Sequence, residues 1–190
     1  VETFYGRAGV PWALLYDQVG SFLALSTWGA MVVSTYGDGP KPTIGGVAKS
    51  VVRFPPFIAL MCALVLREFS RPPELTAAFE AVGASLVPVV MVSVGLQLRL
   101  RLHAEDRLPF AAGLLVKLLV APLIAWGVAR AMGWSGLPTN VSVFEAAMPP
   151  MVIASVLATE AGLAPRLASA MVGYGIIGSF ATLPFWAWWL

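Results

Sequence analysis

The residues of this chain whose types and spacing could do chemistry lie around a doubled proline. Glu145 stands three residues before Met148, which is followed by Pro149 and Pro150, and Asn140 lies a little earlier. Two consecutive prolines remove two backbone N–H donors and clash with the preceding turn, so they break a helix. Unwound backbone beside a carboxylate and an amide is a candidate binding site, and a simple proline kink is the alternative interpretation.

The stretches around these residues are too long and too apolar for a soluble domain. Of the 190 residues, 58% are hydrophobic and 12% are charged, against about 25% charged in a typical soluble domain. No charged residue lies between Asp17 and Asp38, between Glu80 and Arg99, or after Arg166. A helix crosses a bilayer with roughly 20 apolar residues. The sequence therefore predicts an all-α integral membrane protein and excludes a soluble enzyme and a nucleic-acid-binding protein.

Charged residues inside such stretches must face protein or water, because a charge at bilayer depth costs about 2.5–3.5 kcal/mol. Lys117 could attract an anion or form a structural ion pair with a carboxylate, and both alternatives stay open. Asp17 lies early in its stretch, where a hydrated or capping role competes with a role in ion coupling. The single histidine, His103, and the single cysteine, Cys62, provide neither a metal cluster nor a nucleophile–base pair, so we expect no enzyme and no metal.

Turn residues and charges divide the sequence into six predicted transmembrane helices, and the fifth of these contains the doubled proline. The second is the weakest, because Lys49 and Arg53 must extend to the membrane interface for it to span. The predicted helices cover about 10–36, 47–66, 74–98, 108–132, 138–162 and 165–190.

The lysines and arginines of the connections indicate an orientation. Connections after the first, third and fifth helices carry seven of them, and the opposite side carries four. Because cytoplasmic connections are enriched in Lys and Arg, we expect the more basic side in the cytoplasm and the C-terminus outside. Trp186, Trp188 and Trp189 near the C-terminus are typical of an aromatic belt at the membrane interface.

A weak internal repeat is also present. Gly9 and Gly20 are spaced like Gly162 and Gly173, and the five predicted helices between the two copies reverse their direction across the membrane. Such reversal is typical of the inverted repeats of carriers. On this interpretation residues 1–36 end a first five-helix repeat, residues 44–190 form the second, and residues 1–6 end a broken helix whose break lies upstream.

Four segments resemble the auxin efflux carrier family of membrane transporters, in its bacterial branch. The resemblance implies ten helices in two inverted halves with broken helices crossing at the centre, and it implies that 1–190 is the later, incomplete part of one transport domain. The segments are residues 8–22, 88–98, 145–150 and 158–163.

The resemblance also implies a function and a site. It implies a permease of the bacterial inner membrane that moves small organic anions such as carboxylates by alternating access. Met148, Pro149 and Pro150 match the crossover of the second broken helix, and we expect substrate there, beside Asn140 and Glu145. Glu145, Lys117 and Asp17 are candidates for coupling to a proton or sodium ion. No cofactor is expected beyond such an ion; the expected partners are the bilayer and the anion, and a homodimer is a candidate assembly.

Two alternative functions stay open. A sodium-coupled symporter of the bile-acid type has a related fold with crossed broken helices, and stimulation of uptake by sodium would identify it. A membrane scaffold or sensor without transport activity, or an inactive fragment, is the other alternative.

Overall fold

The computed structural model describes residues 1–37, 55–66, 72–97 and 104–190, and within these ranges the chain is helical and contains no strand. The predicted all-α class is therefore confirmed for that part of the chain. Contacts divide the chain into two compact units, one formed by Val1–Pro42 with Arg99–Leu190 and the other by Thr43–Leu98. This division by contacts does not test the predicted boundary between the two repeats, at residues 36 to 44, which stays a prediction.

The smaller unit contains α5 (Pro55–Val65) and α6 (Pro73–Gln97). At about 1.5 Å per residue, the 25 residues of α6 make it as long as a bilayer's hydrocarbon core is thick. Large apolar side chains such as Phe79 and Leu86 are exposed along it. The first part of the second predicted span, residues 47–54, lies outside the described residues.

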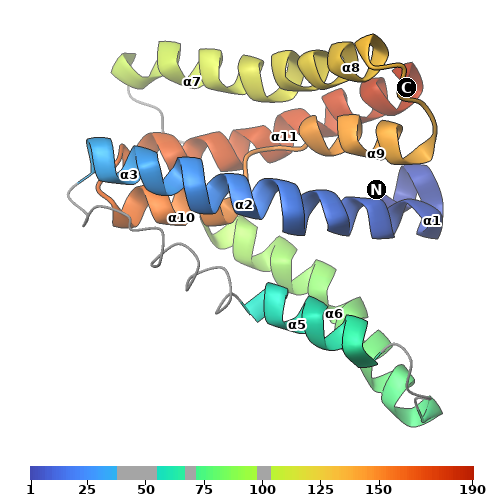
Figure 1. Cartoon of the computed structure of the whole chain (residues 1–190). Coiled ribbons are helices and arrows are strands. Elements are labelled where there is room, and N and C mark those ends of the chain that lie inside the picture. The colour runs from blue at the N-terminus through green and yellow to red at the C-terminus, as the bar shows by residue number, and fades with distance from the viewer. Residues whose placement is uncertain (38–54, 67–71, 98–103) are drawn as a thin grey trace. The chain divides into compact units, whose positions relative to one another are not determined.

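In the larger unit, the first part of the chain forms one long helical rod (Figure 1). The rod begins after a break at Gly6, whose φ of 65° and ψ of −173° are those of a glycine turn, so the first residues run in a different direction. The break that the sequence predicts in the first broken helix lies upstream of residue 1, so it and the inverted repeat stay predictions. The rod consists of the residues of α1 (Glu2–Leu15) that follow Gly6, the π-helical turn η1 (Tyr16–Ser21), α2 (Phe22–Ala24), the π-helical turn η2 (Leu25–Gly29) and α3 (Ala30–Tyr36).

Two further rods are long and apolar enough to cross a membrane. They are Arg107–Ala131 and Pro165–Trp189, with 25 residues each. Two of the six predicted spans thus meet this criterion within the described residues, and the others stay predictions. The first rod follows a short 3-10 turn η4 (Ala104–Asp106) and consists of α7 (Arg107–Leu115), the π-helical turn η5 (Val116–Val120) and α8 (Ala121–Ala131), while the second is α11 (Pro165–Trp189).

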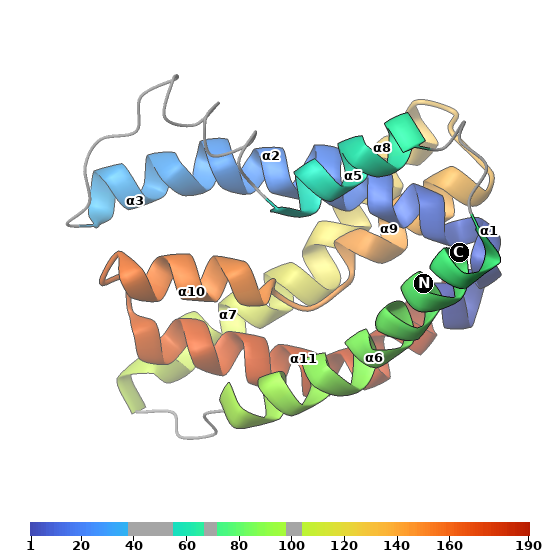
Figure 2. The same cartoon turned by 90° about the horizontal axis from the view of Figure 1, so that it is seen from below.

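The fifth predicted span is interrupted. It consists of α9 (Leu137–Ala146) and α10 (Val152–Glu160), joined by an extended segment that includes Pro149 and Pro150. Figure 2 shows the two halves on either side of this segment. The interruption occurs where the doubled proline predicts it.

The core of the larger unit lies where α1, α9 and α11 meet. Phe144 and Trp186 are each only 1% exposed, and the rings of Phe4 and Tyr5 both lie 5.3 Å from that of Phe144. The placement of Trp186 corrects a prediction, because a residue in this core is not part of an interfacial belt. Trp188, by contrast, is 80% exposed, since residues two apart on a helix project about 200° apart.

Candidate functional site

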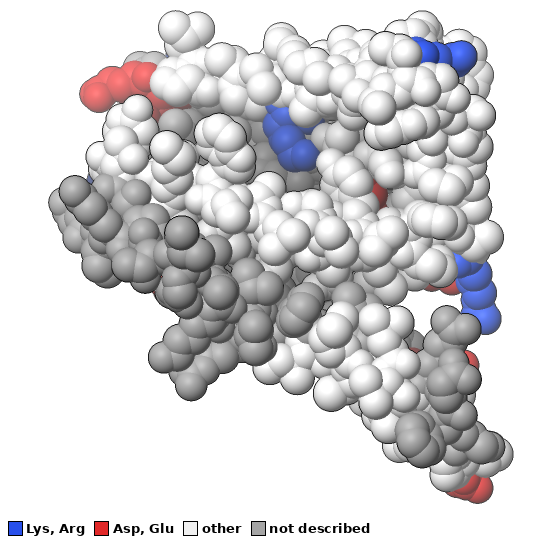
Figure 3. All heavy atoms as spheres, in the orientation of Figure 1, with Lys and Arg blue, Asp and Glu red and all other residues white. Residues whose placement is uncertain are grey.

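A cavity of about 570 Å³ lies where the first rod, η5 and the interrupted helix meet. We call it the crossover cavity. In the space-filling view a basic side chain lies in a hollow of an otherwise largely uncharged surface (Figure 3). The residues that line the cavity are Tyr16, Asp17, Ser21, Ala24, Leu25, Gly29, Lys117, Glu145, Met148, Pro149, Pro150, Met151, Ala154 and Met171.

The prolines free two backbone carbonyls beside this cavity from their helical hydrogen bonds. In an α-helix each carbonyl accepts the N–H four residues later, so Pro149 and Pro150 leave the carbonyls of Glu145 and Ala146 without their usual donors. The N–H of Met148 donates to the Glu145 carbonyl at 3.1 Å. The Ala146 carbonyl accepts a hydrogen bond from Lys117 Nζ at 3.0 Å.

Lys117 is therefore bound to the broken end of α9. The C-terminal end of a helix carries partial negative charge, so a cation there is favourable. Within the described part of the chain no carboxylate lies within 4.0 Å of this ammonium group, and both predicted roles, attraction of an anion and a structural ion pair, stay predictions. An ammonium group has three N–H donors. With one on Ala146, two can serve a ligand in the cavity.

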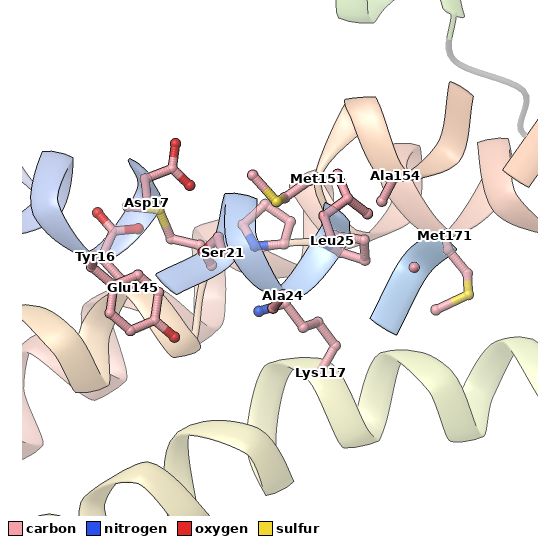
Figure 4. Close-up of a pocket in the computed structure, with 14 residues that line it drawn as sticks. Tyr16, Asp17, Ser21, Ala24, Leu25, Lys117, Glu145, Met151, Ala154 and Met171 are labelled. Atoms are coloured by element: carbon pink, nitrogen blue, oxygen red, sulfur yellow. The ribbon is translucent and has the colours of Figure 1, made fainter. Parts of the chain in front are cut away.

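The acidic residues lie at one end of the cavity. Figure 4 shows Tyr16, Asp17 and Glu145 grouped there, with Lys117 reaching in from the opposite rod. At the other end the labelled side chains are small or apolar, namely Ala154 and Met171. The crossover cavity thus combines one cationic group, two carboxylic acids, a phenol and an apolar wall.

All three π-helical turns of the described chain contribute to this cavity. Tyr16, Asp17 and Ser21 come from η1, Leu25 and Gly29 from η2, and Lys117 from η5. π-helical turns are rare and occur frequently at functional sites, because the widened turn redirects side chains. No feature of the sequence indicated them, so Tyr16 and Ser21 were missed.

Gly175 on α11 is a third residue that the sequence did not single out. A Cβ at this position would lie 2.7 Å from Pro150 Cδ and 3.4 Å from Pro149 Cβ. Only a glycine lets α11 approach the doubled proline this closely without displacing it. The doubled proline therefore packs directly against the backbone of α11.

A further proline-freed carbonyl lies in the rod that bears Lys117. Pro122 has no N–H for the carbonyl of Leu118, and this carbonyl accepts a 3.0 Å hydrogen bond from the indole Nε1 of the buried Trp186. This bond ties α11 to the residue next to Lys117.

The predicted site residues separate into two groups. Asp17, Lys117, Glu145, Met148, Pro149 and Pro150 line the crossover cavity. Asn140 does not; its side-chain amide donates to the Leu190 carbonyl at 3.1 Å, and it lines a smaller cavity beside the α8–α9 connection. The structure brings the first group together, and the roles assigned to its members stay predictions.

Comparison with known proteins identifies the family. A family profile described as "Membrane transport protein" matches residues 44–187, which is most of the chain. The chain belongs to the membrane transport protein family. This match confirms the resemblance to the auxin efflux carriers. Members of the membrane transport protein family are membrane transporters. This is consistent with the expectation that the chain is not an enzyme, and it indicates a location in a membrane.

A curated relative supports the same family. The chain is 29% identical over 187 residues to an "Uncharacterized transporter" of Methanothermobacter thermautotrophicus, an alignment that covers 96% of this chain and 59% of that protein. This chain therefore spans about three fifths of the length of that member of the membrane transport protein family. No solved structure matches the chain.

Proposed function

We propose that this chain forms part of a secondary transporter that moves small organic anions, such as carboxylates, across a membrane by alternating access. The observation that carries the proposal is the Lys117 ammonium, held 3.0 Å from the Ala146 carbonyl at the broken end of α9, inside the crossover cavity. A cation beside unwound backbone is suited to a carboxylate, and within the described residues one of the three N–H donors of Lys117 has a partner.

The walls of the cavity support a substrate with an apolar body. Leu25, Met148, Met151 and Met171 form much of the lining, and flexible thioether side chains adapt to ligands of different shape. We propose that the carboxylate lies at Lys117 and that the body of the anion packs against these side chains.

Glu145 and Asp17 repel an anion when both are ionised, so the proposal includes a coupled cation. We propose that Glu145 takes up a proton, or pairs with a cation, while the anion is bound. Alternating access would then follow from a movement of the halves around the break between α9 and α10 against the neighbouring rods.

Reconstitution of the complete protein into vesicles tests this function. Uptake of a panel of radiolabelled monocarboxylates and dicarboxylates is measured with sodium or with choline as the external cation. We expect uptake of at least one acid that is unaffected by the exchange, because the Glu145 carboxylate can take up a proton in place of a sodium ion. A requirement for sodium would favour the bile-acid type of symporter. Absence of uptake of every acid by correctly inserted protein would favour a scaffold and overturn the proposal.

A further inference from the structure

Tyr16 lies between the crossover cavity and a second cavity. The second cavity, which we call the outer cavity, has a volume of about 470 Å³, and Tyr16 is the lining residue that it shares with the crossover cavity. Tyr16 is the first residue of η1, where the rod changes from an α-helical to a π-helical turn. The outer cavity is lined by Tyr16, Ala125, Val128, Ala129, Trp134, Pro138, Thr139, Ser142 and Val143.

The outer cavity continues to the end of the helices at which α8 connects to α9. It shares Ala129, Trp134, Thr139 and Val143 with a third cavity of about 220 Å³, which also contacts Arg130 in the last turn of α8. The three cavities therefore follow one another from the broken helix to the α8–α9 connection, and Tyr16 occupies the junction between the first and the second.

The cavities on the two sides of Tyr16 differ in the charge of their lining residues. The crossover cavity contains Lys117, Glu145 and Asp17, whereas the described residues that line the outer cavity carry no charge. The Ser142 hydroxyl there already donates to the Pro138 carbonyl at 2.8 Å. An ion leaving the charged cavity loses its partners as it enters an uncharged one, which is costly. The junction is therefore the place where a side chain controls passage most effectively.

We propose that Tyr16 is a gate that closes the crossover cavity toward the α8–α9 end of the protein. The aromatic ring blocks the junction, and its rotation away from the junction opens the path into the outer cavity. The assignment rests on the proposed function, since a gate requires a transported substrate. It adds a named residue that controls access from one side.

Cysteine accessibility in the complete protein tests the gate without any substrate. Cys62 is the single cysteine of the sequence, so Cys62→Ser provides a background without thiols. Ala154→Cys places a thiol in the crossover cavity, at the end away from Tyr16 (Figure 4), and Ser142→Cys places one in the outer cavity. A membrane-impermeant thiol reagent is added to each face of the membrane in turn, and the face from which Ser142→Cys reacts defines the α8–α9 side.

From that side we expect Tyr16→Ala to accelerate labelling of the thiol introduced by Ala154→Cys by at least about tenfold, which corresponds to a barrier lowered by ~1.4 kcal/mol. Tyr16→Phe keeps the ring and should leave the rate unchanged. Tyr36→Ala, which removes a tyrosine that is 76% exposed at the end of α3, is the matched control. Labelling of Ser142→Cys should be equal in all these variants.

Two results would overturn the gate: an unchanged rate for Ala154→Cys in Tyr16→Ala, or a thiol from Ser142→Cys that reacts from neither face. Because labelling needs no transport, the gate and the proposed function fail separately. Acceleration in a protein that transports no carboxylate would remove the proposed function alone. Carboxylate uptake with unchanged labelling would remove the gate alone.

Discussion

At the residue scale, the Ala146 carbonyl connects the broken backbone of α9 to the charged side chain of Lys117, which lines the crossover cavity. Pro150 removes its helical donor, and Lys117 replaces that donor with an ammonium group at 3.0 Å. A charge-assisted hydrogen bond of this kind contributes about 1.5–3 kcal/mol. The doubled proline and the lysine, distant in sequence, therefore form one polar unit at the crossover cavity.

Glu145 supplies the test of cation coupling at this scale. We expect Glu145→Gln to reduce carboxylate uptake by at least about tenfold, because a neutral amide cannot take up a proton or pair with a cation. Insertion into the membrane should be normal, since the amide has nearly the same shape. The measurement is initial uptake in reconstituted vesicles, with Glu160→Gln, at the exposed end of α10, as the control. Normal uptake by Glu145→Gln would remove this residue from the site.

Residue types alone predicted much of this site but not its contacts. Glu145, Lys117 and the prolines are conspicuous because they lie in apolar stretches. Asn140 looked equally suitable, yet at about 100° per residue its side chain projects roughly 140° away from that of Glu145, and its amide binds the Leu190 carbonyl instead. Tyr16 was missed because an aromatic residue in an apolar span carries no signal of its own, and its position depends on a π-helical turn.

At the element scale, prolines open helices and other elements supply the missing donors. The carbonyl of Ala146 receives an ammonium from η5, and that of Leu118 receives the indole of Trp186 from α11. Each bond connects two helices at the point where one is weakened. In a membrane, where water is absent, a carbonyl without a donor is costly.

Trp186→Phe tests the second of these bonds. We expect the free energy of unfolding to fall by about 1–3 kcal/mol, because the substitution keeps an aromatic ring but leaves the buried Leu118 carbonyl without its donor. Thermal unfolding in detergent measures the change. Trp188→Phe, at a position that is 80% exposed, should have little effect. Equal stability of the two variants would contradict a role for the indole hydrogen bond.

Gly175→Ala tests the packing of α11 against the crossover. The added Cβ would lie 2.7 Å from Pro150 Cδ, so the doubled proline must move, and overpacking of this kind costs about 1–3 kcal/mol. We expect a lower initial rate of uptake together with reduced thermal stability. Gly127→Ala on α8 is the matched control, because nothing lies within 4 Å of its added Cβ. If both variants behave like the unmodified protein, the crossover is not packed as described.

The elements were predicted better than their details. Two prolines in an apolar span suffice to predict the interruption between α9 and α10, since their chemistry is local. Trp186 was assigned to the interface because three tryptophans cluster near the C-terminus, but the helical rotation between residues turns it into the core while Trp188 faces outward. The π-helical turns η1, η2 and η5 were not predicted, because their residue types do not distinguish them from α-helical residues.

At the scale of the whole molecule, the distribution of positive charge determines the expected orientation. The connection before α7 contains Arg99 and Arg101, and Arg107 opens that helix, whereas the α8–α9 connection is preceded by Arg130 alone. The positive-inside tendency therefore predicts that the α8–α9 connection lies outside.

Accessibility of single thiols in intact cells measures this orientation. In the Cys62→Ser background, the thiol introduced by Ser135→Cys in the α8–α9 connection should react with an impermeant reagent. The thiol introduced by Glu105→Cys, in the turn before α7, should react only after the membrane is opened. The reverse pattern would invert the orientation and would contradict the location of the C-terminus outside.

We propose that the Lys117 ammonium at the broken helix binds the carboxylate of the transported anion. The most direct measurement compares carboxylate uptake by Lys117→Met with that by Arg107→Gln, which removes a cation from the exposed start of the same rod. Methionine keeps the length of the side chain and removes its charge and donors. We predict that Lys117→Met lowers the initial rate at least about tenfold, while Arg107→Gln retains it. Equal rates for the two variants in correctly inserted protein would contradict the claim.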